Sequence, residues 1–375
     1  MNDDAVVSMD DVTIEFTSET LFGLAESETV RAVDSVSLDI GAGEVVALVG
    51  ESGCGKTTLG KTAIGLHRPT SGTVTYRGTD VWEAKRNGGL LGRFRNTGTE
   101  HSHEEIRRAL QIIHQDPEAS LDSNSTVESI LEEPLLRWEP DLSRADRRAR
   151  IHNFIEYVGL EPADEYVDRF PHQLSGGEQQ RIALIRALLM NPDLILADES
   201  ISALDVSLRI DMMDLMLELQ NQINTSYLFI THNISNARYV TKKSGGRIGI
   251  MYLGEIVEIG PVDEVINNPQ HPYTKALVWA TPDIGATREE MSAVGIENAP
   301  LRAIDVPDPA DPPSGCSFHD RCPEARETCV NTEPDSYQAG PEHQAVCFRV
   351  NEQHEYWRSQ EIEGEVGDHV AAESD

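Results

Sequence analysis

Short apolar runs alternate with amphipathic stretches along the chain as far as about residue 265. Residues 44–50 form an apolar run that leads into a glycine-rich turn, and residues 56–66 have helical character, so a strand, a loop and a helix are predicted in succession. Two later apolar runs, 194–197 and 227–231, lead into Asp198 and His232. Short buried strands alternating with helices indicate a parallel α/β sheet, with functional residues at the carboxyl ends of its strands.

Polar and proline-containing segments divide the rest of the pattern. Residues 79–105 are polar and predict a surface insertion. Residues 118–170 predict amphipathic helices, which we expect to be broken by Pro134, Pro140 and Pro162. After about residue 265 proline becomes frequent, which indicates a loop-rich appendage rather than more sheet.

The charge of the chain is strongly negative, with 64 Asp and Glu against 31 Lys and Arg and a net charge of −33 over 375 residues. Such a surface repels phosphate backbones, so a protein that coats nucleic acid is not expected. Only 6 of the basic residues are lysines. Excess acid with few lysines indicates adaptation to concentrated salt, where self-repulsion is screened; an ordinary acidic cytosolic protein is the alternative. The segment 351–375 carries eight acidic residues against one arginine and is expected to be a disordered tail.

Neither a membrane span nor a signal sequence is indicated. No stretch approaches the roughly 20 apolar residues of a spanning helix, and the first eleven residues lack the basic and apolar pattern of a signal peptide. We therefore expect a cytoplasmic chain, whose role at a membrane, if any, depends on a partner.

A phosphate-binding loop follows the first apolar run. The pattern is a glycine, four residues, then Gly-Lys-Thr. Glycines let backbone N–H groups turn toward a polyphosphate, and the following helix presents its positive end. Lys56 would bridge the β- and γ-phosphates, and the Thr57 hydroxyl would bind Mg²⁺. The residues of this predicted loop are Gly50, Glu51, Ser52, Gly53, Cys54, Gly55, Lys56 and Thr57, and Thr58 adjoins them.

Two further segments complete a nucleotide site. Asp198 can hold the Mg²⁺ shell at a strand end, and Glu199 beside it can polarise the attacking water. The run 174–181 places Ser-Gly-Gly at a helix start, with Glu178 in the first turn. A second helix end that can bind an anion suggests a nucleotide shared between two subunits.

Over about residues 9–265 the sequence resembles the ATP-binding subunits of ABC transporters, and the run 174–181 is similar to the signature of that family. The resemblance implies a P-loop NTPase fold of ABC type with a helical signature subdomain at about 118–175. It implies that Gln115 touches Mg²⁺ and senses the membrane partner, that His232 contacts the γ-phosphate and that Phe16 stacks on adenine. It further implies a signature that acts on the facing subunit, Leu174, Ser175, Gly176, Gly177 and Glu178, and a loop that crosses to that subunit, Ser202, Ala203, Leu204 and Asp205.

The sequence departs from the family in three places. Ser200-Ile201 stand where Pro-Thr usually follows the catalytic glutamate. The insertion at 79–105 is long, and the segment from Lys242 to Gly246 interrupts the connection between helix and strand after His232. None of these removes a catalytic group, so an active ATP site is expected.

Features beyond the ATP site resemble the oligopeptide and dipeptide import branch of this family. They include the run 115–122, Glu133-Pro134-Leu135, the run 252–260 and the run 271–277. The extension over 266–350 contributes four cysteines, Cys316, Cys322, Cys329 and Cys347. Clustered cysteines in a reducing compartment indicate metal ligands more than disulfides. The resemblance implies a 4Fe–4S cluster, while zinc and a purely structural quartet stay open; Cys54 is expected only to pack.

The resemblance implies an ATP-hydrolysing subunit, peripheral on the cytoplasmic face of the membrane, that powers import of dipeptides or oligopeptides. It needs ATP and Mg²⁺, two membrane permeases, a second ATP-binding subunit that is identical or paralogous and, indirectly, an extracytoplasmic solute-binding protein. Nucleic acid is not an expected partner. The alternatives are cargo such as nickel, an opine or a sugar, a soluble ATPase acting on nucleic acid or ribosomes, and a degenerate subunit that barely hydrolyses ATP.

Overall fold

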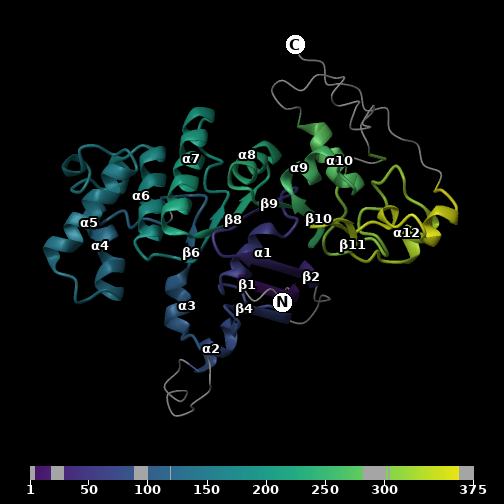
Figure 1. Ribbon diagram of the computed structural model, residues 1–375, viewed down its shortest axis with the longest axis horizontal. Coiled ribbons are helices and arrows are strands. Elements are labelled where there is room, and N and C mark those ends of the chain that lie inside the picture. Colours follow the sequence, from purple (N-terminus) through teal and green to yellow (C-terminus); the bar gives the residue numbers. More distant parts are fainter. Residues whose placement is uncertain are drawn as a thin grey trace, which may run out of the picture.

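The computed structural model describes residues 5–17, 29–87, 100–118, 120–281, 301–302 and 305–362. Two sheets form its centre, with most of the helices above and to the left of them in Figure 1. The larger sheet has the order β11-β12-β10-β9-β3-β8-β7-β6. Its strands are β3 (Val45–Val49), β6 (Leu110–Ile113), β7 (Leu194–Asp198), β8 (Ser226–Thr231), β9 (Arg247–Tyr252), β10 (Glu255–Pro261), β11 (Tyr337–Gly340) and β12 (His343–Ala345).

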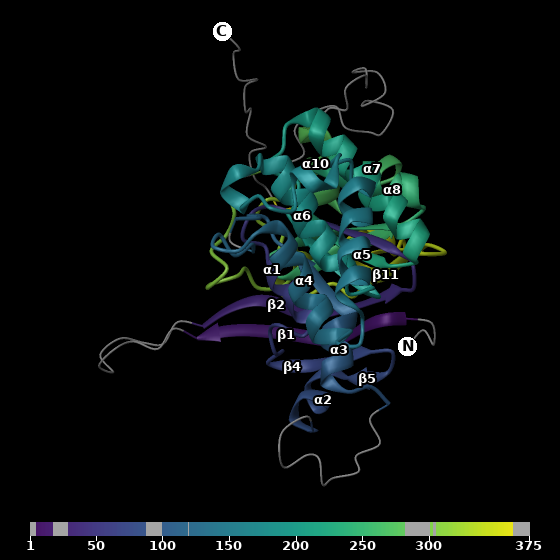
Figure 2. The same ribbon diagram turned by 90° about the vertical axis from the view of Figure 1, so that its left-hand side faces the viewer.

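The strands from β6 to β9 pair in parallel, whereas β10, β12 and β11 continue the sheet in antiparallel fashion. The smaller sheet is antiparallel and has the order β2-β1-β4-β5. Figure 2 shows its long strands β1 and β2 crossing beneath the helices. Its strands are β1 (Ala5–Thr17), β2 (Thr29–Gly41), β4 (Ser71–Tyr76) and β5 (Thr79–Asp80).

Alternate side chains of β3 enter two different cores, because successive residues of a strand point to opposite faces. Ala47 and Val49 pack with the helices α6–α9, while Val46 and Leu48 pack with α1 and the smaller sheet. A strand buried on both faces reads as a continuous apolar run, which is the pattern that predicted it. The helices are α1 (Lys56–Ala63), α2 (Val81–Asn87), α3 (His103–Ala109), α4 (Val127–Trp138), α5 (Arg144–Tyr157), α6 (Gly176–Leu188), α7 (Val206–Ile223), α8 (Ile234–Ser244), α9 (Val262–Asn267), α10 (Pro272–Ala280) and α12 (Glu327–Asn331), with short 3₁₀ turns at Ala163–Glu165, Pro171–Gln173, Phe348–Val350 and Glu355–Arg358.

A third core lies between α4, α5 and α6, which Figure 1 shows together at the left end of the molecule. The expected break at Pro134 is wrong, because this proline lies inside α4. Its nitrogen cannot donate the usual bond to Ile130, but the helix continues because Leu131 and Leu135 are fully buried on its inner face.

The expectation that residues 79–105 form only a surface insertion is also wrong at both ends of that segment. Thr79 and Asp80 pair with β4, and the Asp80 carboxylate accepts the backbone N–H groups that begin α2. Val81 and Ala84 are buried one helical turn apart. The Ser102 capping box begins α3, and residues 88–99 lie outside the described part of the chain.

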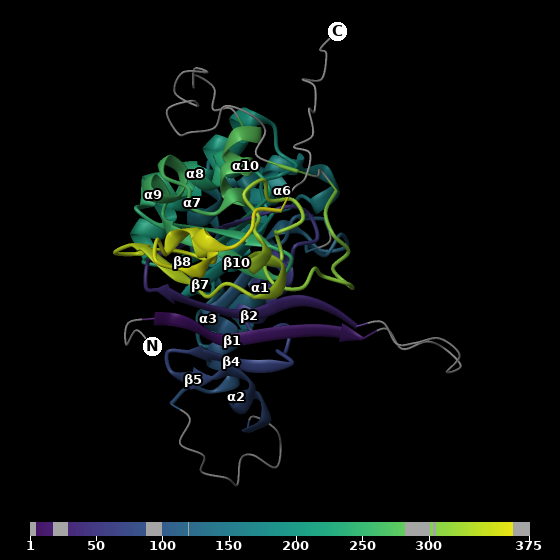
Figure 3. The same ribbon diagram turned by 90° about the vertical axis from the view of Figure 1, so that its right-hand side faces the viewer.

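Two expectations about the later part of the main domain and the extension need correction. The segment from Lys242 to Gly246 does not interrupt a connection: Lys242–Ser244 belong to the last turn of α8, Gly245 ends the helix at φ 70°, and Gly246 leads directly into β9. The extension does add sheet, because Ala345 and Gln344 of β12 pair with β10. Figure 3 shows the extension against this end of the sheet.

Part of the predicted disordered tail is folded. Tyr356 is buried against the extension, and the Arg326 guanidinium donates to the carbonyls of Trp357 and Ser359 and pairs with Glu361. Residues 363–375 lie outside the described residues. Among the helices described, none is long and apolar enough to cross a membrane.

The hairpin of β11 and β12 is anchored by a buried hydrogen bond between side chains, in which His343 Nε2 lies 2.7 Å from Glu258 Oε1. The same carboxylate accepts the backbone N–H groups of Gln270 and His271 at 2.8 Å. We expect Glu258→Ala to lower the free energy of unfolding by about 3 kcal/mol, because it leaves three buried donors without an acceptor. Urea denaturation measures this, with the exposed Glu342→Ala as the matched control; equal losses in the two variants would contradict it.

Candidate functional site

The loop between β3 and α1 turns tightly enough to expose a row of backbone N–H groups. Gly53 and Gly55 take φ values of 84° and 102°, in the left-handed region that side chains disfavour. A Cβ at Gly55 would lie 2.1 Å from the carbonyl oxygen of Ala32, so only glycine fits there. The loop therefore has the shape that a polyphosphate needs, at the positive end of α1.

The polar groups of this loop lie close to the end of β7. The buried Lys56 ammonium donates to the carbonyls of Gly50 and Glu51 at 2.9 and 2.8 Å. The Thr57 hydroxyl donates to Asp198 Oδ1 at 2.8 Å. A hydroxyl and a carboxylate at this separation are hard oxygen ligands suited to one Mg²⁺, and Cys54 is buried behind them.

Glu199 and His232 follow the ends of two neighbouring strands, β7 and β8. His232 Nδ1 lies 3.4 Å from Glu199 Oε2. The backbone of Glu199 is held in the left-handed region at φ 48°, and its N–H donates to the Ile230 carbonyl at 3.0 Å. A residue other than glycine is strained in this conformation, so the surrounding hydrogen bonds must keep it there. The glutamate is thereby fixed beside the phosphate loop, with a histidine facing it.

The predicted crossing loop begins just after Glu199. The Arg209 guanidinium donates to the carbonyls of Ser202 and Leu204, and Asp205 begins α7 by accepting the N–H of Leu208. Ala203 and Asp205 are exposed. The loop is therefore rigid on its inner side and open on its outer side.

Gln115 and Phe16 lie at the margins of the site. Gln115 is exposed, two residues beyond the end of β6. Phe16 lies near the end of β1 with about half of its surface exposed and its ring edge-on to His67. An exposed aromatic ring is available for stacking, but its role with adenine stays a prediction.

The predicted signature residues begin α6 and lie apart from the phosphate loop. Ser175 and Glu178 form a capping box, in which Glu178 Oε2 accepts the Ser175 N–H at 2.7 Å. Leu174 is buried, while Ser175 and Gly176 are exposed. Figure 1 shows α6 beside α4 and α5, away from α1 at the centre.

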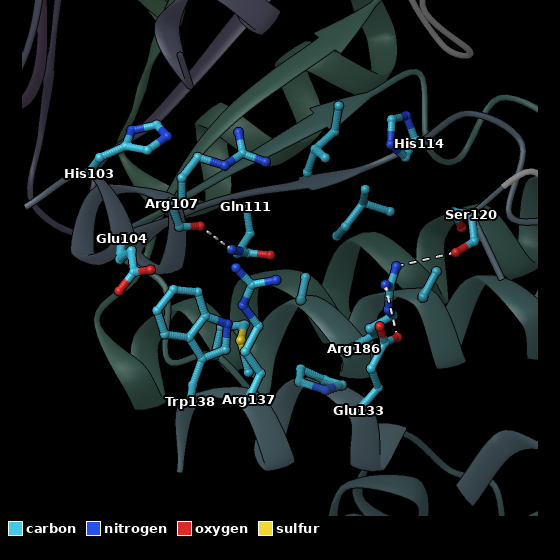
Figure 4. Close-up of a pocket in the computed structure, with 16 residues that line it drawn as sticks. His103, Glu104, Arg107, Gln111, His114, Ser120, Glu133, Arg137, Trp138 and Arg186 are labelled. Carbon is cyan, nitrogen blue, oxygen red and sulfur yellow. Dashed lines mark hydrogen bonds and ion pairs between the residues drawn. The ribbon is translucent and has the colours of Figure 1, made fainter. Parts of the chain in front are cut away.

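A groove of about 700 Å³ lies between α3, β6, α4 and α6 (Figure 4). Arg107, Arg137 and Arg186 line it, together with Trp138. Arg186 donates to the Ser120 carbonyl at 3.2 Å and lies 3.7 Å from Glu133. Three guanidinium groups in one groove are conspicuous in so acidic a chain, and no sequence signal pointed to them, because they come from three separate helices.

The four cysteines of the extension line one small cavity, together with His271 and Arg349. Burial raises the pKa of Cys322 to about 12 and that of Cys347 to about 11, and it also raises the pKa of Cys316 and Cys329. Burial in a site of low dielectric constant favours the neutral thiol over the thiolate. In the described ranges, no set of three or more His, Cys, Asp or Glu side chains is placed to hold a single metal ion.

One contact at the phosphate loop was not predicted. Arg321 of the extension binds the Glu51 carboxylate with both terminal nitrogens, at 3.0 and 3.1 Å. These residues are 270 positions apart in the sequence. The sequence shows each of them within a motif, but nothing in either motif indicates that they pair.

Comparison with known families and structures agrees with this geometry. Residues 33–202 match the family described as ABC transporter, and residues 257–329 match the C-terminal region of oligopeptide/dipeptide transporters. The structure is similar to the dimeric ATP-binding cassette MJ0796 in a post-hydrolysis state with ADP and Pi. The TM-score is 0.54 at 27% identity, over 68% of this chain and 98% of that one.

Similar proteins extend over most of the chain. The oligopeptide transport ATP-binding protein AppF of Bacillus subtilis is 40% identical over 85% of this chain and 89% of its own length. The dipeptide transport ATP-binding protein DppF of Haemophilus influenzae is 37% identical over 87% of this chain and 91% of its own. The oligopeptide transport ATP-binding protein OppF of Salmonella typhimurium is 39% identical over 86% of this chain and 89% of its own length. The chain therefore belongs to the ATP-binding subunits of ABC transporters, in the branch that carries the oligopeptide/dipeptide C-terminal region.

Proposed function

We propose that this chain hydrolyses ATP between two ATP-binding subunits and so powers the import of dipeptides or oligopeptides. Its family and the names of its relatives support the cargo class. The observation that carries the catalytic part is the convergence of Lys56, Thr57 and Asp198 with Glu199 and His232 at the carboxyl edge of one parallel sheet. The adaptation to concentrated salt inferred from the charge stays a prediction.

Each group has a distinct role in the proposed reaction. Lys56 leaves the loop carbonyls to bind the β- and γ-phosphates, and Thr57 and Asp198 would hold Mg²⁺, which neutralises charge on those phosphates. Glu199 orients the attacking water and takes its proton, while His232 contacts the γ-phosphate from the neighbouring strand. Gln115, two residues beyond the end of β6, would touch Mg²⁺ and sense the permease.

A second chain supplies what one chain lacks. The start of α6, where Ser175 is exposed, belongs to a helix that Figure 1 shows beside α4 and α5 and away from α1. In a dimer the signature of each chain would close over the ATP of the other. Closure with ATP and opening after hydrolysis would then drive the permeases between their two access states.

Glu199→Gln tests the hydrolytic role. We expect turnover to fall by about two to four orders of magnitude, because the amide cannot accept the proton of the attacking water. ATP binding should persist, and the dimer should accumulate in the closed state. Phosphate release and size-exclusion chromatography in molar salt measure both, with the exposed Glu264→Gln as control. Unchanged turnover in Glu199→Gln would show that another group acts as the base.

The groove of Arg107, Arg137 and Arg186 is the surface that we propose for the permease. It is lined by α3, α4 and α6, so it joins the domain of the phosphate loop to the helical subdomain. Its arginines and Trp138 suit an amphipathic cytoplasmic helix that carries acidic residues. Arg137 is exposed and its guanidinium lies 5.2 Å from the centre of the Trp138 ring, and both side chains line the groove.

Charge reversal tests this docking surface. We expect the double variant Arg107→Glu/Arg137→Glu to lose at least tenfold of the permease recovered with the tagged chain, because like charges then oppose across the interface. Its affinity for ATP should stay unchanged. Arg144→Glu, an exposed arginine on α5 outside the groove, is the matched control. Equal recovery with the double variant and the control would place the permease elsewhere.

We propose that the four cysteines hold a 4Fe–4S cluster, which their donor type supports. Thiolates are the ligands that such clusters take, and the cavity gathers four of them from one segment of the chain. A four-iron cluster binds each sulfur to a different iron, so the sulfurs need not converge on one point as the ligands of zinc do. Arg349 lines the same cavity, and burial, together with the charge of Arg349, lowers the pKa of Lys275. Positive side chains there would offset the charge of a thiolate-bound cluster.

Anaerobic purification tests the cluster. We expect about four irons and four sulfides per chain, with visible absorption that Cys322→Ser reduces by at least half. Cys54→Ser, which changes the cysteine of the phosphate loop, is the control and should keep the full iron content. Zinc in place of iron, or neither metal in the anaerobically purified chain, would contradict the cluster.

A further inference from the structure

The loop between two of the cysteines reaches the phosphate loop. We name residues 316–322 the cysteine arm, because Cys316 and Cys322 form its ends. Its path is set by its own backbone bonds, in which His319 donates to Cys316 at 3.0 Å and Arg321 donates to Phe318 at 3.1 Å. The Arg302 N–H fastens the arm from outside by donating to the Arg321 carbonyl at 2.9 Å.

Arg321, next to the last residue of the arm, forms a bidentate ion pair with Glu51. Arg321 is almost completely buried, with 3% of its side chain exposed, and Glu51 is 30% exposed. Both nitrogens of the fork meet both oxygens of the carboxylate, which fixes the direction of the Glu51 side chain as well as its charge. A buried arginine with two matched bonds is a more rigid partner than a surface lysine.

Aromatic rings hold the guanidinium in place. Its central carbon lies 5.6 Å from the ring centre of Tyr252 and 5.7 Å from that of Phe318, which itself belongs to the arm. Tyr273 completes the group, with its ring 5.5 Å from Phe318, and its hydroxyl accepts the backbone N–H of Glu51 at 3.0 Å. The extension and α10 therefore hold both the side chain and the backbone of one residue in the phosphate loop.

The negative charge of Glu51 explains why its pairing with Arg321 matters for ATP binding. A carboxylate next to Gly50 stands in the loop that must receive the most anionic part of ATP. Unpaired, it would repel the phosphates; paired with Arg321, it presents almost no net charge.

We propose that Arg321 is a positioning residue of the ATP site, which neutralises and orients Glu51 so that the C-terminal extension sets the affinity for nucleotide. The proposal rests on the ATP site proposed above.

Equilibrium binding of trinitrophenyl-ATP to the full chain, with ATP as competitor, tests the proposal. We expect Arg321→Gln to raise the dissociation constant of ATP about tenfold, the effect of one like charge near the phosphates. The loss should shrink as KCl rises, because salt screens this repulsion. At saturating ATP, turnover should change less than twofold.

A second substitution separates charge from structure. Glu51→Gln in the Arg321→Gln chain should restore the affinity to within twofold of the unmodified chain, because no carboxylate is left to repel ATP. A double variant as weak as the single one, or a single variant that binds normally, would overturn the proposal. If Arg321→Gln does not fold, Arg321→Lys and Glu51→Gln alone replace it. Arg321→Lys keeps the positive charge and should lose less than threefold in affinity, whereas Glu51→Gln leaves Arg321 unpaired beside the phosphates and should bind ATP more tightly at low KCl. A tenfold loss of affinity in either variant would overturn the proposal.

Lys56→Ala distinguishes failure of the ATP site from failure of this proposal. It should abolish binding whatever residue 321 is. Normal binding by Lys56→Ala would refute the assigned ATP site, whereas lost binding together with an unaffected Arg321→Gln would refute only the role of the extension.

Discussion

Complete burial of β3 is the constraint on which the site depends. All five of its residues pair with β8 on one side, four of them pair with β9 on the other, and their side chains enter two cores. A strand held on four sides cannot shift its register, since a slip by one residue would exchange its two faces. The loop after Val49 therefore leaves the sheet at a fixed point beside the ends of β7 and β8. Catalytic groups that are far apart in the sequence meet there because parallel strands share an edge.

The parts of this arrangement that depend on strand order and local pattern could be predicted from the sequence. The strands ending at Val49, Asp198 and Thr231 are apolar runs, and the groups after them belong to recognisable motifs. Backbone strain at Glu199 could not be predicted, because φ there is imposed by the bond from its N–H to Ile230 on the next strand. The predicted helix break at Pro134 was wrong for the opposite reason. Proline does disfavour the interior of a helix, but burial of Leu131 and Leu135 outweighs this preference.

Contacts between segments that are far apart in the sequence were the hardest features to predict. The proline-rich composition of the extension correctly indicated loops, but not that Ala345 pairs with the edge strand β10 or that Glu258 meets His343. A three-residue strand carries too little pattern to be recognised, and its partner can be known only from the folded chain. The arginine groove has the same origin, since α3, α4 and α6 each contribute a single guanidinium group.

The pairing of Arg321 with Glu51 sets an order of events during synthesis. A ribosome adds roughly 5–20 residues each second, so Arg321 follows Glu51, 270 residues earlier, by about 15–50 s. Throughout that interval β3 and its phosphate loop have been synthesised, but the arginine that neutralises the Glu51 carboxylate has not. The nascent domain thus passes through a stage in which the Glu51 carboxylate of its phosphate loop is unpaired. The loop acquires its final charge only when the cysteine arm folds back onto it.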